Sequence, residues 1–178
     1  MLNGRTAVAM CVLELTAGGC RFDTTLDAKA GGTMKVAYRL GKDGSLDRAK
    51  KSFESPNIKI GDATIDKDKN VTMEIAFADV TKLSTAQMFN KLQIKRTVET
   101  DGTVALTGTI ANKQPIKVSQ ESLAYFGKEV TVTVTAPGDI VSTNATSKDG
   151  KTATWVWPTE SVFGEPEIKM ELSYKGGA

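Results

Sequence analysis

Hydrophobic and polar residues alternate with a period of two in run after run of this chain. The pattern is clearest over residues 34–40, 71–77, 130–134 and 168–174. In the third run, for example, Val130, Val132 and Val134 alternate with threonines. Successive side chains of a strand point to opposite faces, so this pattern predicts strands with one face buried and one in water. Such strands are typical of antiparallel sheets.

Residues that favour turns separate these runs. The pairs Gly31-Gly32, Asp101-Gly102 and Asp149-Gly150 each stand between two strand-like segments, as does the segment 67–70. Asp-Gly is among the strongest short signals for a hairpin. The expected strands, about ten in all, include 22–30, 58–66, 92–100, 103–111, 140–146 and 151–157.

Three short segments have the features of helices instead. Residues 45–53 begin with Ser45 as a candidate N-cap, and residues 119–126 begin with Ser119 and end before Gly127. Residues 81–92 carry apolar side chains at helical spacing. We therefore predict an α+β fold: a mainly antiparallel β-sheet of about ten strands with two or three short helices.

The composition narrows the function. The chain has 178 residues, which suits one domain, and a net charge of +2, which is too small to indicate binding to nucleic acid. It has no histidine, which excludes Ser-His-Asp catalysis and histidine-ligated metals. Both cysteines, Cys11 and Cys20, lie in the first twenty residues. No pair of carboxylates stands out, so we expect no enzyme, no metal site and no bound cofactor.

The first twenty residues resemble an export signal. Arg5 precedes a short apolar stretch, and the small residues Ala17, Gly18 and Gly19 stand directly before Cys20, as in a bacterial lipobox. We expect residues 1–19 to be a signal peptide and residues 20–178 a single domain. The resemblance to the lipobox implies diacylglycerol and a fatty acid such as palmitate on Cys20.

Two residues depart from this pattern. Ala17 stands where a lipobox usually has leucine, and Glu14 lowers the hydrophobicity of the apolar stretch. A plain secretory signal, or an uncleaved N-terminal anchor with Cys20 incidental, therefore remains an open alternative.

Three motifs in the rest of the chain resemble a known family. They are Phe-Ala-Asp-Val at 77–80, the hairpin Glu-Thr-Asp-Gly-Thr at 99–103, and Ala-Pro-Gly-Asp at 136–139 followed by Asn144, Asp-Gly at 149–150 and Thr-Trp at 154–155. Their order resembles the LppM-like bacterial lipoproteins. The resemblance implies an exported, lipid-anchored α+β domain at the cell envelope that binds lipid or glycolipid. It supplies no catalytic residues.

The last of these motifs contains the candidate site residues. Pro137, Gly138 and Asp139 predict a sharp structural turn, because proline fixes φ, glycine is flexible and aspartate bonds nearby amides. Asn144 is expected to pin a turn through its side chain. Trp155 and Trp157 share one face of a strand, where they either belong to the core or form a ligand-binding platform.

These observations predict a non-enzymatic, extracytoplasmic lipoprotein held on the membrane by its N-terminal lipid. Its expected partners are the membrane and a lipid or glycolipid, and not a nucleic acid. The alternative is an accessory structural subunit of a larger membrane protein complex. A lipid-binding protein needs a deep apolar cavity, whereas a subunit needs a broad, flatter apolar patch.

Overall fold

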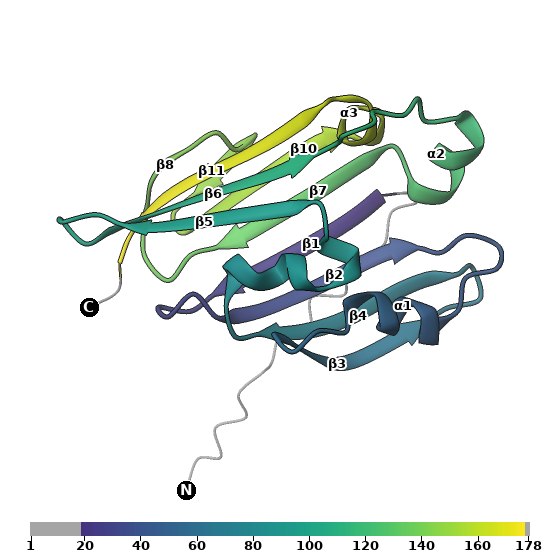
Figure 1. The fold of residues 1–178 in the computed structure, drawn as a ribbon, viewed down its shortest axis with the longest axis horizontal. Coiled ribbons are helices and arrows are strands. Elements are labelled where there is room, and N and C mark those ends of the chain that lie inside the picture. Colours follow the sequence, from purple (N-terminus) through teal and green to yellow (C-terminus); the bar gives the residue numbers. More distant parts are fainter. Residues whose placement is uncertain (1–18, 177–178) are drawn as a thin grey trace, which may run out of the picture.

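The computed structural model describes residues 19–176. Apart from Gly19, the expected signal peptide lies outside the described residues, and so does Cys11. Within the described part of the chain, eleven strands form two sheets and short helices cover or flank them (Figure 1). The predicted fold class, α+β and rich in antiparallel strands, is confirmed.

The larger sheet has seven strands, and the strand that begins the described chain lies in its middle. In sheet order the strands are β3 (Ile58–Ile65), β4 (Asn70–Phe77), β2 (Gly32–Arg39), β1 (Gly19–Leu26), β7 (Glu129–Thr135), β10 (Thr152–Pro158) and β9 (Ser147–Asp149). Neighbouring strands are antiparallel except β1 and β7, which are parallel. The parallel pair was not predicted, because it joins segments about a hundred residues apart and leaves no local signal.

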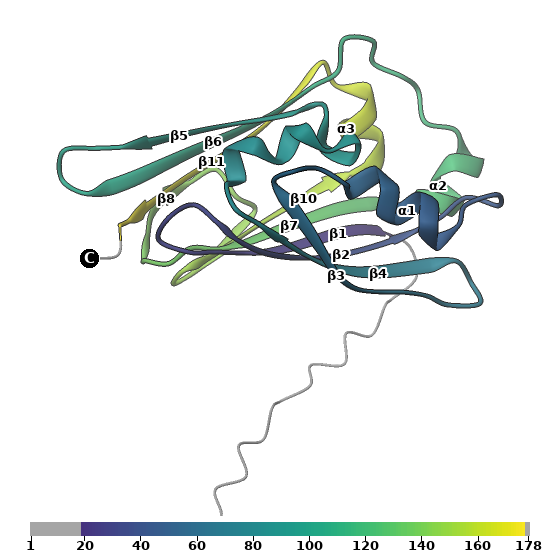
Figure 2. The ribbon, with the colours of Figure 1, turned by 60° about the horizontal axis from the view of Figure 1, so that its bottom comes forward.

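The smaller sheet has four strands and lies over one half of the larger one. In sheet order they are β5 (Leu92–Val98), β6 (Thr103–Ala111), β11 (Glu167–Lys175) and β8 (Ile140–Thr143), all antiparallel to their neighbours. Figure 2 shows this sheet on the same side of the larger sheet as the helix that follows β2. The inward-facing apolar residues of both sheets meet between the two layers.

Helices cover the other half of the same face. Helix α1 (Leu46–Phe53) begins at Ser45, whose hydroxyl accepts a hydrogen bond from the amide of Arg48 at 3.3 Å. Two 3₁₀-helices, η1 (Val80–Thr85) and η2 (Gln87–Phe89), lie beside it. Phe53 of α1 and Phe89 of η2 meet edge to face with ring centroids 5.4 Å apart, so the covering elements pack on one another as well as on the sheet.

Two further helices lie at one end of the molecule (Figure 1). Helix α2 (Gln120–Phe126) is capped by Ser119 as predicted, and Gly127 ends it with φ 78°. Helix α3 (Thr159–Gly164) was not predicted from the sequence. Its first residue, Thr159, is fully buried and donates from its hydroxyl to the carbonyl of Gly127 at 2.8 Å. None of the helices that the structure describes is both long and apolar enough to cross a membrane.

The predicted helix over residues 81–92 is wrong. The segment forms η1 and η2, which are separated by Ala86 in an extended conformation, and β5 already begins at Leu92. Ala86 is almost fully buried, so packing of this residue against the core, rather than its helix propensity, sets the backbone here.

The predicted strand over residues 140–146 is confirmed only over residues 140–143, and its predicted pairing with 151–157 is wrong. Residues 140–143 form β8, which pairs with β11 in the smaller sheet. A separate strand, β9, pairs with β10 across the predicted Asp149-Gly150 turn. The chain thus changes sheets near Asn144, and the local turn signal could not show this because the partner strand is the last one in the sequence.

Candidate functional site: an apolar cavity between the two sheets

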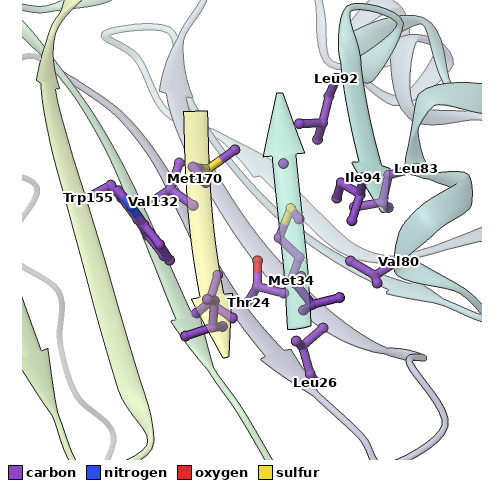
Figure 3. Close-up of a pocket in the computed structure, with 14 residues that line it drawn as sticks. Thr24, Leu26, Met34, Val80, Leu83, Leu92, Ile94, Val132, Trp155 and Met170 are labelled. Carbon is purple, nitrogen blue, oxygen red and sulfur yellow. The ribbon is translucent and has the colours of Figure 1, made fainter. Parts of the chain in front are cut away.

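A cavity of about 80 Å³ lies between the two sheets (Figure 3). Its walls come from β1, β2, β7 and β10 on one side, β5, β6 and β11 on the other, and η1 at an edge. The lining residues are Thr24, Leu26, Met34, Val80, Leu83, Leu92, Ile94, Leu106, Gly108, Val132, Val134, Trp155, Met170 and Leu172. Apart from the Thr24 hydroxyl and the Trp155 indole N–H, their side chains are hydrocarbon or thioether, so the cavity suits an apolar guest.

Gly108 is one reason that this space is unfilled. In register across the smaller sheet it lies between Ile94 of β5 and Met170 of β11, and all three line the cavity. A Cβ atom at position 108 would lie 3.0 Å from Cε of Met170 and 3.8 Å from Cδ1 of Leu92. Glycine thus contributes no side chain where other inward-facing positions of β6 carry valine, leucine and isoleucine, and the end of Met170 covers it.

The flexible residues around the gap are methionines. Met34 of β2 and Met170 of β11 both line the cavity, and Figure 3 shows their sulfur atoms between the walls. Methionine side chains change rotamer easily and adapt to irregular surfaces. The cavity can therefore change shape without a movement of either sheet.

Trp155 forms one wall and also joins the two sheets. The side chain is 3% exposed, and its indole N–H donates to Oδ1 of Asn144 at 2.8 Å. The same Oδ1 accepts from the backbone amide of Glu171 in β11 at 2.8 Å. Asn144 therefore does more than pin a local turn: it links β10 of the larger sheet to β11 of the smaller one.

Trp157 is placed differently. It is half-buried and packs against the core, but it does not line the cavity. It pairs with Val130, which in turn lies beside Cys20 of β1. Of the two predicted tryptophans, Trp155 thus lines the candidate site. Trp157 lies outside its lining.

The predicted turn residues Pro137, Gly138 and Asp139 lie away from the cavity lining. A Cβ atom on Gly138 would collide with the carbonyl oxygen of Lys175, so the close approach of this corner to β11 requires glycine. The backbone amide of Lys175 donates to the carbonyl of Asp139 at 2.9 Å. The corner therefore fastens the end of β11 to the loop before β8.

Cys20 is the second residue of β1, in register with Val130 of β7. Its side chain packs against the core on the inner face of the sheet. Burial raises the pKa of the thiol to about 11, so the folded domain keeps it protonated and weakly nucleophilic at neutral pH.

Sequence reasoning missed Arg96, which lies beside the cavity on the inner face of β5. It follows Leu92 and Ile94 in the alternation, and its cross-strand partner is Leu106. The signal that could have found it is a charged residue at an apolar position of a strand, since a buried polar group is more informative than an exposed apolar one. Gly108 interrupts the apolar face of β6 in the same way.

The electrostatics give no catalytic arrangement at this cavity, because its lining contains no ionisable side chain. Across residues 19–176, no group of three or more histidine, cysteine, aspartate or glutamate side chains is placed to hold a metal ion. What the lining residues can do chemically is bind an apolar group by contact and by exclusion of water.

The fold is that of an α+β domain in which two sheets enclose an apolar interior. Comparison with known proteins identifies its family. A sequence model of the LppM domain matches residues 21–164, so the chain belongs to the LppM domain family. The fold is similar to that of the folded domain of the Mycobacterium tuberculosis LppM protein, solved by NMR, with a TM-score of 0.51 and 16% sequence identity. That match covers 98% of this chain and 97% of the other. No curated protein sequence matches the chain.

Proposed function

We propose that this protein is a non-enzymatic, membrane-anchored lipoprotein of the bacterial cell envelope that binds lipid or glycolipid. The observation that supports lipid binding best is the apolar cavity between the sheets. Membership of the LppM family supports a lipoprotein at the envelope. In this proposal the cavity holds hydrocarbon and the head group stays outside it.

The size of the cavity defines how much of a lipid enters it. About 80 Å³ is well below the ~300–1,000 Å³ of a typical small-molecule site. It accommodates a short part of an acyl chain as it stands. Rotation of Met34 and Met170 would lengthen the space, because both side chains lie at its walls and neither is held by a polar contact.

The absence of ionisable groups from the cavity lining supports a binding role rather than a catalytic one. Covalent catalysis needs a nucleophile with an adjacent base, and general acid–base catalysis needs a titratable group within hydrogen-bond reach. The lining offers only the hydroxyl of Thr24, which is 5% exposed.

The proposed membrane anchor is a lipid on Cys20. The LppM match begins at residue 21, directly after this cysteine, where the mature chain of a lipoprotein would continue. Because the thiol packs inward in the folded domain, we propose that lipid is attached before β1 joins the sheet and that the lipidated strand begins at Arg21. The domain would then lie directly on the membrane, without a linker.

The test of the anchor is the variant Cys20→Ser. If the lipid holds the protein, the variant moves from the membrane fraction to the soluble fraction, whereas wild type stays bound after a high-salt wash. Intact-mass measurement of the native protein tests directly whether Cys20 carries the lipid. A chain that starts at Met1, or an unmodified Cys20, would contradict lipidation and favour an uncleaved anchor.

The test of lipid binding is a variant that fills the cavity. Gly108→Val adds a Cβ atom whose one tight contact is with the mobile end of Met170, and two methyl groups beyond it, so we expect a folded protein with a smaller cavity. Gly41→Val is the matched control, since Gly41 is an exposed glycine outside the cavity and a Cβ atom there would meet nothing within 4 Å. Each protein is purified from membranes and analysed by mass spectrometry for bound lipid.

We expect lipid with wild type and Gly41→Val and much less with Gly108→Val. Circular dichroism and thermal unfolding show whether each variant has the native fold. Wild type that carries a second protein but no lipid would contradict lipid binding and favour the accessory-subunit role.

A further inference from the structure

An arginine lies next to the apolar cavity, on the inner face of the smaller sheet. Arg96 stands on the inward-facing row of β5, two residues after Ile94. Across the smaller sheet its row continues through Leu106 of β6 and Leu172 of β11. Ile94, Leu106 and Leu172 all line the cavity, so the base of the arginine side chain borders the cavity wall on two sides.

One hydrogen-bond donor of Arg96, the Nε atom, is buried without a partner in the part of the chain that the structure describes. A buried N–H group without a partner is costly, and most such groups in proteins are paired. The residue as a whole is half-buried, so part of the side chain still reaches solvent. Arg96 therefore has an unsatisfied hydrogen-bond donor beside residues that line the cavity.

Asp79 interacts electrostatically with Arg96, but its carboxylate already accepts hydrogen bonds from another residue. Asp79 Oδ1 accepts from the hydroxyl of Thr81 at 2.7 Å and from its amide at 2.9 Å. Its Oδ2 lies 3.9 Å from Nζ of Lys82. Hydrogen bonds from Thr81, with smaller contributions from Lys82 and Arg96, hold the pKa of Asp79 below its usual value. Within residues 19–176, no carboxylate lies within 4.0 Å of a guanidinium nitrogen of Arg96.

We propose that Arg96 binds the anionic group of an amphiphile whose hydrocarbon chain occupies the cavity. This inference rests on the proposed lipid binding and specifies the ligand: a carboxylate or phosphate joined to an alkyl chain. The planar guanidinium donates to such oxygen pairs in a fork, which a lysine does not do. A neutral lipid would leave the buried Nε of Arg96 without a partner, and an acidic one would satisfy it.

The test uses the full chain purified in a non-ionic detergent and two photoactivatable probes. One probe is palmitic acid with a diazirine in its chain, and the other is the methyl ester of the same molecule. The probes share their hydrocarbon and differ in charge. Mass spectrometry locates the cross-links, and we expect the acid to label peptides of β6 and β11 at least about tenfold more than the ester, the ratio that one charged hydrogen bond supplies.

Variants of Arg96 test whether this residue causes the preference for the acid over the ester. Arg96→Gln should lower labelling by the acid to the level of the ester, and Arg96→Lys should retain part of the preference because it keeps the charge. Lys95→Gln is the matched control: Lys95 is the adjacent residue, it points to the exposed face of β5, and its removal should leave the preference unchanged. Circular dichroism establishes that each variant is folded. Acetate, which has the carboxylate without the chain, should not compete.

The outcomes separate this inference from the proposed function. If neither probe labels the cavity peptides of wild type, lipid binding itself is wrong. If both probes label them equally, or if the preference survives in Arg96→Gln, lipid binding stands and the role of Arg96 is wrong. Competition by acetate would show a site for small anions and would also overturn the proposal. Should Arg96→Gln fail to fold, loss of the acid preference in folded Arg96→Met supports the proposal and its persistence overturns it.

Discussion

The inner face of the seven-stranded sheet has two halves that are built from the same alternating pattern but packed differently. One half, which we call the helix-covered half, consists of β2, β3 and β4 under α1, η1 and η2. Here Val36, Phe53, Val71 and Met73 have no exposed surface at all. The other, the sheet-covered half, consists of β1, β7 and β10 under the smaller sheet. The cavity lies here and reaches Met34 of β2 and the edge of η1.

The difference shows how the covering element decides whether a core is filled. In the helix-covered half, aromatic rings from short, separate elements adjust to one another: the ring centroids of Phe89 in η2 and Phe53 in α1 are 5.4 Å apart. At the boundary between the halves, Phe89 lies 6.1 Å from Phe22 of β1. In the sheet-covered half, ladders of hydrogen bonds fix each layer, and the layers of stacked sheets stay about 10 Å apart. A position without a side chain, such as Gly108, is then covered only by the flexible end of Met170, and the cavity beside it stays unfilled.

Trp155→Ala is expected to have the largest effect. Trp155 borders the cavity, yet it is 3% exposed and hydrogen-bonded to Asn144, so it is a core residue as well as a wall. Its removal should lower the free energy of unfolding by ~3–5 kcal/mol and should also weaken lipid binding. Chemical denaturation measures the first effect, with half-buried Trp157→Ala as a control that should lose less stability. A fully stable Trp155→Ala would mean that the sheet-covered half contributes little to stability.

A pair of methionine substitutions tests the comparison directly. Met73 in β4 is fully buried in the helix-covered half, whereas Met170 in β11 is half-buried at the cavity. Loss of a buried methionine costs ~2–5 kcal/mol, and we expect Met73→Ala near the upper end and Met170→Ala at or below the lower end. Met170 already has unfilled space on one side, so it has fewer contacts to lose. Equal losses of unfolding free energy in the two variants would contradict the proposed difference in packing.

Asn144→Ala tests the link between the two sheets. The side chain accepts from Trp155 Nε1 and from the amide of Glu171, and its Nδ2 donates to the carbonyl of Lys169 at 3.2 Å. Its loss should cost ~1–3 kcal/mol, because the indole N–H is left without a partner in a buried position. Ser142→Ala, on the exposed side of β8, is the control and should change stability little. If the two variants were equally stable, the sheets would be held together by apolar contact alone.

The smallest expected effect is the pH dependence of an exposed contact at the far end of the smaller sheet. Hydrogen bonds from the amide and hydroxyl of Thr103, and one from Lys175, lower the pKa of Asp101 to about 2. The unfolded value is ~3.9, so the folded state favours the ionised form. The resulting stabilisation is complete above pH ~4 and is lost as the pH falls through about 2. Asp101→Asn should remove this part of the acid dependence, as measured by thermal unfolding at a series of pH values; an unchanged profile would contradict it.

The individual strands and two of the helices could be predicted because their signals are local. The alternation in residues 71–77 corresponds to β4, and the serine caps at 45 and 119 mark the starts of α1 and α2. Where the prediction was wrong, a distant contact decided the structure. Ala86 breaks a helical segment because it is buried, and residues 140–143 pair with β11, thirty residues further along the chain.

The candidate site was predictable only in outline. The sequence indicated Trp155 as a core or binding residue, and the structure places it in both positions. Gly108 and Arg96 were visible as breaks in the apolar alternation of β6 and β5, but a break alone does not show what lies opposite. Whether lipid is attached at Cys20 stays a prediction, and the inward position of that side chain is a fact of the tertiary structure.

The sequence by itself determined which residues form strands, which face of each strand is apolar, and that this is an α+β chain without histidine chemistry. These properties follow from side-chain alternation and composition, which operate over a few residues at a time. Only the tertiary structure decided that the chain divides its strands between two sheets, that a gap remains between them at Gly108, and that Arg96 borders this gap. These features depend on pairings between segments far apart in sequence, and the free energy of such pairings comes from packing that no local pattern contains.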